Sequence, residues 1–212
     1  MRVRLLSITP GAEKLIEEAG RTAYLSFRRN SKGGHEKFIR MLVGKKHLTV
    51  LEHASATFRI SGCSRAFTHQ LVRHRLCSFT QQSQRYVNET AFDFVEPGSI
   101  KIDKKAHLLF VSYIKQAKSI YSRLRKLGIR NEDARFVLPN AVVSEIVVTA
   151  NLREWRHIIE IRGNVDAQWE IRRVAIAILK LLRQKAPTVF EDFAIDRNNE
   201  CVKKRVGKYD TT

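Results

Sequence analysis

The chain has 212 residues, 43% hydrophobic and 28% charged, which is typical of a globular protein with a core large enough to fold unaided. No apolar run reaches the roughly 20 residues of a membrane span, and three scattered cysteines suggest neither a disulfide framework nor a zinc site. The formal net charge of +18 points to an anionic ligand or partner, and nucleic acid is one alternative.

Short strands and helices alternate in the first half of the chain. Periodicity predicts them in the order Arg2–Ile8 (strand), Glu13–Tyr24 (helix), Glu36–Val43 (helix) and Ala56–Ser61 (strand). Ser64 is a candidate N-cap for a helix that runs through Leu71 and brings Arg73 to its C-terminal end.

Helices dominate the second half. The clearest one is Lys104–Leu127, where a single apolar stripe includes Leu109, Tyr113 and Ile120. The segment Ala141–Ala150 is either a strand or a buried helix. Two further helices are predicted at Asn151–Ile161 and Gln168–Leu182, and a basic, flexible tail covers about 197–212. The fold class is α+β, with an early antiparallel sheet packed by helices in a single domain over 1–212.

The segment Arg73–Tyr86 concentrates the chemistry of the chain. Its sequence, RHRLCSFTQQSQRY, combines arginine forks with serine hydroxyls, and no lysine or carboxylate interrupts it. These groups suit an anionic ligand such as phosphate. On a helix Arg73 and Arg75 would serve two different ligands, whereas on an extended chain they would grip one phosphate together.

The spacing of this segment resembles the defining motif of the flavin-dependent thymidylate synthases: Arg-His-Arg, two residues, Ser, four residues, Ser, one residue, Arg. That family usually has Asn and Glu at the positions of Thr80 and Gln81. Further segments match the family in the same order, at 134–139, 151–157, Arg162 and 167–172. The resemblance extends over roughly 21–190.

The resemblance implies reductive methylation of dUMP to dTMP, with 5,10-methylenetetrahydrofolate as carbon donor and FAD reduced by NADPH. A hydride is needed at the pyrimidine and no side chain can supply one, so a redox cofactor is required. The sequence has no Gly-rich dinucleotide fingerprint, which excludes a Rossmann-type flavin site. The family binds FAD at subunit interfaces of a homotetramer, so the resemblance implies a homotetramer with shared sites. The scattered cysteines and the lack of a long apolar run predict a cytoplasmic protein.

Residue roles follow from the resemblance. Arg162 is the expected catalytic residue, beside the uracil ring. The expected dUMP ligands are Gln70, Arg73, Gln81, Gln82, Ser83, Gln84, Arg85, Arg135 and Arg162. The expected FAD ligands are Thr49, Arg73, His74, Arg75, Gln81, Asn151, Arg153 and His157.

Some positions keep an alternative or depart from the family. Ser83 is expected to bind the dUMP phosphate, with a nucleophilic role as the alternative. Ala23 replaces a small polar residue, and Gln81 lacks the usual carboxylate. No metal ligand is assigned, because His47 and His53 have no third ligand at metal spacing.

A basic nucleic-acid-binding protein is the second hypothesis. It accounts for the +18 charge better than the enzyme does. It does not account for the ordered motifs, and the sequence lacks an interleaved aromatic platform for bases.

Overall fold

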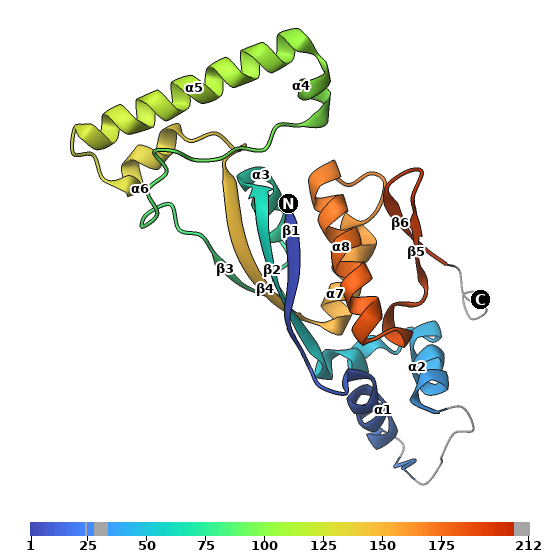
Figure 1. The fold of residues 1–212 in the computed structure, drawn as a ribbon. Helices are drawn as coiled ribbons and strands as arrows, with labels where there is room; N and C mark the ends of the chain where they lie inside the picture. The colour runs from blue at the N-terminus through green and yellow to red at the C-terminus, as the bar shows by residue number, and fades with distance from the viewer. Residues whose placement is uncertain (24, 28–33, 206–212) are drawn as a thin grey trace. The chain divides into compact units, whose positions relative to one another are not determined.

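The structure, a computed structural model, describes residues 1–23, 25–27 and 34–205 (Figure 1). The strands are β1 (Arg2–Ile8), β2 (Ser55–Ser64), β3 (Ser78–Gln81), β4 (Val143–Asn151), β5 (Phe193–Asp196) and β6 (Cys201–Lys204). The α-helices are α1 (Ala12–Thr22), α2 (Gly34–Gly44), α3 (Arg65–Leu71), α4 (Gly98–Ile102), α5 (Lys104–Lys126), α6 (Asn131–Ala134), α7 (Leu152–Arg162) and α8 (Trp169–Lys185). The 3-10 helices are η1 (Leu48–His53), η2 (Arg135–Val137) and η3 (Thr188–Phe190). The predicted α+β class is confirmed.

The chain forms two compact units. Unit 1 consists of Met1–Arg2, Ile60–Leu71 and Thr80–Ile146, and unit 2 of Val3–Arg59, Val72–Phe79 and Val147–Thr212. The division falls within β2 and β4, after Arg59 and after Ile146. The two units interleave along the sequence. A single domain over 1–212 stays a prediction.

A four-stranded antiparallel sheet has the strand order β1-β2-β4-β3. Buried residues alternate with partly exposed ones along all of β4, which is the pattern of a strand with one covered face. This settles the segment Ala141–Ala150, for which the sequence left a strand and a buried helix open. In unit 2 the hydroxyls of Thr57 and Thr149 lie 2.9 Å apart across β2 and β4.

Helix α7 is anchored in the core of unit 2 by Trp155, whose side chain is fully buried. The indole Nε1 donates to the carbonyl oxygen of Ala56 at 3.0 Å, and the ring meets Phe58 edge to face at a centroid distance of 4.9 Å. Truncating a buried tryptophan costs about 3–5 kcal/mol. The helix is therefore a rigid base for the side chains that it carries.

The C-terminal segment also belongs to this core. Strand β6 pairs antiparallel with β5, and both Cys201 and Val202 are buried. The backbone N–H of Val202 donates to the carbonyl of Gly163, directly after α7, at 2.7 Å. Figure 1 shows the β5–β6 pair beside α7 and α8. The predicted flexible tail is therefore wrong for Cys201–Lys204, and 206–212 lie outside the described residues.

Unit 1 contains the long helix α5, flanked at its two ends by α4 and α6 (Figure 1). Asp103 caps its N-terminus by accepting from the backbone N–H groups of Lys105 and Ala106. Only part of the predicted apolar stripe is buried, at Ile114, Ala117 and Tyr121. Other members of that stripe are exposed, namely Leu109, Tyr113, Ile120 and Leu127. Among the described residues, no helix is long and apolar enough to cross a membrane.

Candidate functional site

The motif segment begins where α3 ends. The Ser64 hydroxyl accepts from the backbone N–H of Phe67 at 3.1 Å, which confirms the predicted N-cap. The helix stops at Leu71, and 72–76 form turns that leave Arg73 and Arg75 exposed. Neither the helical nor the extended arrangement is correct. Further along the motif segment, Ser78–Gln81 form the strand β3.

In unit 1, amide side chains hold the second half of the motif in place. Gln81 Nε2 donates to Thr68 Oγ1 at 2.9 Å and to Ser144 Oγ at 3.1 Å. Gln82 Nε2 donates to Glu89 Oε1 at 2.9 Å, and burial raises the pKa of this carboxyl group. Since these amides already have protein partners, they shape the loop that carries Ser83.

Two arginines expected to bind dUMP are organised in unit 1 by Glu132. Arg85 Nε and Nη2 both lie 3.1 Å from Glu132 Oε2, and Arg135 Nε donates to the Glu132 backbone carbonyl at 3.1 Å. The backbone N–H of Arg85 donates to Ser83 Oγ at 3.3 Å. Unit 1 thus brings Ser83, Arg85 and Arg135 into one hydrogen-bonded cluster with Glu132. Gln70, whose amide donates to the carbonyl of Ala66, also lies in unit 1, as does the half-buried Gln84.

Unit 2 contains a cavity of about 490 Å³ between the motif turn and α7. Its lining side chains are Arg73, His74, Arg75, Leu76, Glu154 and His157. A second cavity of about 490 Å³ shares Leu76, Glu154 and His157 with the first, so the two adjoin. The second also has Asn151 and Arg153 in its lining. Most of the residues expected to bind FAD therefore come together here.

Two members of that set are not among the lining residues. Thr49 is exposed in η1, and Gln81 belongs to unit 1; neither lines these cavities. Asn151 is the N-cap of α7, because its side chain accepts from the backbone N–H of Glu154 at 2.8 Å. Arg153 Nη1 donates to Glu52 at 2.6 Å, which holds this guanidinium at the edge of the second cavity.

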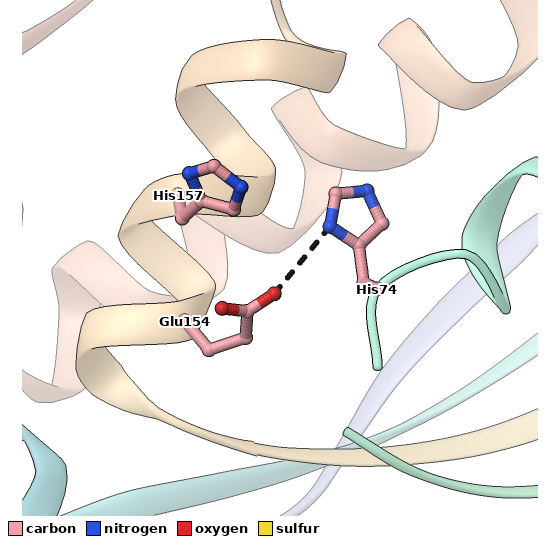
Figure 2. Close-up of side chains that lie close together, drawn as sticks. All are labelled: His74, Glu154 and His157. Atoms are coloured by element: carbon pink, nitrogen blue, oxygen red, sulfur yellow. Dashed lines mark ion pairs between the residues drawn. The ribbon is translucent and has the colours of Figure 1, made fainter. Parts of the chain in front are cut away.

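Arg162, the last residue of α7, does not bond the carbonyls of its own helix as a C-terminal arginine commonly does. Its Nε donates instead to His74 Nε2 at 3.0 Å, across 88 residues of sequence. His74 Nδ1 faces Glu154 Oε1 at 3.4 Å, as Figure 2 shows. His157, one turn after Glu154, meets the His74 ring edge to face at 5.8 Å.

The electrostatics of this cluster keep the imidazole neutral. Burial, the Arg162 guanidinium and His157 lower the pKa of His74 to about 4. Burial raises the pKa of the Glu154 carboxyl group, against the opposing effects of His157 and Arg153. Burial and Glu154 raise the pKa of Cys77 to about 12, so its thiol stays protonated at neutral pH and is a poor nucleophile.

The sequence analysis missed Glu132 and Glu154, the carboxylates that organise these arginines and the histidine. Glu154 stands three residues before His157, and that spacing places both on adjacent turns of one helix face. The spacing could have singled out Glu154 as a neighbour of the site. Its burial, which makes it unusual, comes only from the packing of α7.

An α+β chain with a cationic, histidine-containing cavity fits a protein that binds anionic cofactors or nucleotides, and comparison with known proteins identifies the family. The family model described as thymidylate synthase complementing protein (Thy1) matches residues 4–188. A flavin-dependent thymidylate synthase of Geobacter sulfurreducens is 42% identical over 200 residues, covering 91% of this chain and 86% of that protein. One from Pyrococcus furiosus is 43% identical over 175 residues, covering 81% of this chain and 72% of the relative.

The fold agrees with these matches. The solved structure of thymidylate synthase X from Helicobacter pylori, with FAD and dUMP, superposes with a TM-score of 0.77 at 22% identity. The match covers 91% of this chain and 98% of that one. The chain belongs to the flavin-dependent thymidylate synthases, which confirms the resemblance seen in the motifs.

Proposed function

We propose that this protein converts dUMP to dTMP by reductive methylation, with FAD as hydride carrier, NADPH as reductant and 5,10-methylenetetrahydrofolate as carbon donor. The observation that carries the proposal is the hydrogen bond between Arg162 and His74. It joins the residue expected to act on the uracil ring to the motif expected to bind the flavin. Family membership over 4–188 supports the same activity, as does the solved relative that contains FAD and dUMP.

The residues of the unit 2 cavities fit a flavin dinucleotide. Arg73, Arg75 and Arg153 supply cationic donors for a pyrophosphate, Asn151 supplies an amide of the kind that hydrogen-bonds a ribose, and the His74 ring completes the lining. The two adjoining volumes of about 490 Å³ each are within the range of cofactor sites. FAD bound there supplies the hydride that no side chain can supply.

The proposed role of Arg162 is electrostatic. Negative charge develops on the uracil ring when a nucleophile or hydride adds to it, and a fixed guanidinium stabilises that charge. Arginine has five N–H donors, and the bond to His74 takes one of them. The remaining donors suit the carbonyl oxygens of uracil and, in its N3-ionised form, the ring nitrogen N3.

The phosphate and sugar of dUMP are proposed to be held by Arg135, Gln70, Ser83, Gln84 and Arg85. Further proposed dUMP ligands are Arg73, Gln81 and Gln82. Serine and arginine side chains donate hydrogen bonds to phosphate oxygens, and the salt bridge to Glu132 fixes the position of the Arg85 guanidinium. Because Ser83 Oγ already accepts from a backbone N–H, a binding role suits it better than a nucleophilic one.

A homotetramer with shared sites is part of the proposal. The exposed apolar side chains of α5 support it, with Leu109 at 75% and Tyr113 at 50% exposure. Apolar residues exposed in a row on one helix commonly mark a surface that another chain covers. Such an assembly also suits ligand residues that come from widely separated stretches of the sequence.

The decisive experiment is tritium release from 5-tritiated dUMP. Purified protein with NADPH and 5,10-methylenetetrahydrofolate should release tritium and form dTMP, and it should be yellow or turn yellow with added FAD. Omission of the folate or of the reductant should stop dTMP formation. Bound flavin without tritium release would contradict the proposed activity. Tight, salt-sensitive nucleic-acid binding without turnover would favour the alternative that the +18 charge suggests.

A further inference from the structure

We propose that Glu154 is a positioning residue for this reaction: it fixes the ring proton and the orientation of His74, and through His74 it holds the Arg162 guanidinium. The inference rests on the proposed function, in which Arg162 acts on the uracil ring. The three side chains form one chain of contacts, from Arg162 Nε to His74 Nε2 at 3.0 Å and from His74 Nδ1 to Glu154 Oε1 at 3.4 Å.

The direction of this chain follows from the chemistry of its members. A guanidinium only donates hydrogen bonds, so His74 Nε2 must be the acceptor and carries no proton. A neutral imidazole then has its proton on Nδ1, the nitrogen that faces Glu154. A carboxylate oxygen is the matching acceptor. Glu154 therefore selects the tautomer of His74 that can accept from Arg162.

Burial makes Glu154 difficult to replace by solvent. His74 is 7% exposed and Glu154 is 6% exposed, so most of each side chain is covered by protein. Without the carboxylate, the ring could carry its proton on Nε2, and two donors would then face each other at the Arg162 contact. The histidine would turn, or the guanidinium would move away from it.

The position of Glu154 is itself well defined. It lies in the first turn of α7, where its backbone N–H is bound by the Asn151 cap at 2.8 Å. The next residue, Trp155, anchors the helix in the core. The carboxylate is thus held by the rigid part of unit 2, while His74 lies in a turn that needs an external anchor.

A metal site is the competing explanation, since ligand atoms of His74, Glu154 and His157 all lie within 4.8 Å of one another. Two observations argue against it. A protonated Nδ1 has no lone pair for a cation, and Nε2 already accepts from Arg162. The nearby guanidinium would also repel a divalent ion.

The first test measures which ring nitrogen of His74 carries the proton. In the flavin-loaded enzyme labelled with 15N-histidine, the ring nitrogens of His74 are assigned by comparison with His74→Asn. We expect the Nδ1–H tautomer in the wild type and in Glu154→Gln, whose amide oxygen can still accept, and its loss in Glu154→Leu. A proton on Nε2 in the wild type would overturn the proposal. A metal-bound Nδ1, removable by chelator, would overturn it as well.

The second test separates positioning from folding. Glu154→Leu should lower kcat by about 10–100-fold with flavin content unchanged, and Glu154→Gln should restore kcat to within about threefold of the wild type. Glu191→Leu is the matched control, because Glu191 is an exposed carboxylate of unit 2 paired with Arg40, and its kcat should not change. If Glu154→Leu does not fold, Glu154→Gln and the tautomer of the wild type still decide the question. A folded, flavin-loaded Glu154→Leu variant with wild-type kcat would contradict the proposal. A wild-type enzyme without tritium release would instead contradict the proposed function and leave the tautomer measurement standing.

Discussion

Replacing Arg162 by alanine or by lysine separates the charge of this side chain from its hydrogen-bonding fork. Alanine removes both, whereas lysine keeps a positive charge but cannot contact the substrate and His74 together. Arg162 is half-buried, so an effective dielectric constant of about 20 applies to its interaction with charge on the uracil ring. At a separation of about 4 Å, that interaction is worth about 4 kcal/mol.

About 4 kcal/mol corresponds to roughly a 10³-fold change in rate. We therefore expect Arg162→Ala to lower kcat on the order of 10³-fold while the flavin absorbance persists. Arg162→Lys should fall between the wild type and alanine. The assay is tritium release at saturating dUMP, with Arg173→Lys as a control because Arg173 is an exposed partner of Glu200. A kcat of Arg162→Ala within tenfold of the wild type would refute the electrostatic role, and loss of flavin in that variant would indicate a structural one.

Two further predictions concern the surroundings of this side chain. Gly163→Ala should destabilise the protein by about 1–3 kcal/mol and lower kcat, because a Cβ there would lie 2.5 Å from a carbonyl oxygen of α7 and 2.7 Å from Val202 Cγ2; urea unfolding checks this, and an unchanged midpoint would contradict it. The pKa of His74 is lowered to about 4 in the folded protein. Protonation of this histidine in the unfolded chain should therefore lower the free energy of unfolding by up to about 3 kcal/mol as the pH falls from about 6.5 to about 4. The unfolded chain takes up this proton first, so the loss should be smaller in His74→Asn. The raised pKa of Glu154 acts with the opposite sign, so the difference between wild type and variant is the quantity to compare; equal pH dependence in both would contradict the assignment.

Local sequence patterns determined several helices and strands, and the family, of this protein. The cap at Ser64 was recognisable because an N-cap bonds a backbone N–H only two or three residues ahead. The motif at Arg73–Arg85 was recognisable because a loop that binds an anion needs particular donors at fixed spacing. Such features depend on neighbours along the chain, so they can be read from the sequence alone.

Packing between distant segments decided the rest. Ala141–Ala150 is rich in Val, Ile and Thr, and only its alternating burial in the sheet distinguished a strand from a buried helix. The same holds for Cys201–Lys204, where charged neighbours suggested a free tail but pairing with β5 buries Cys201 and Val202. The apolar stripe on α5 similarly does not show which of its side chains are buried in unit 1.

The candidate site shows most clearly which features follow from the sequence and which depend on packing between distant segments. Arg162 and His74 were both predicted to be functional, each from its own motif. Their contact spans 88 residues and depends on the C-terminal end of α7 reaching the motif turn within unit 2. The spacing of Glu154 from His157 places it near the site, but a glutamate on a helix is ordinarily exposed. Only burial beside an imidazole gives its carboxylate a specific partner.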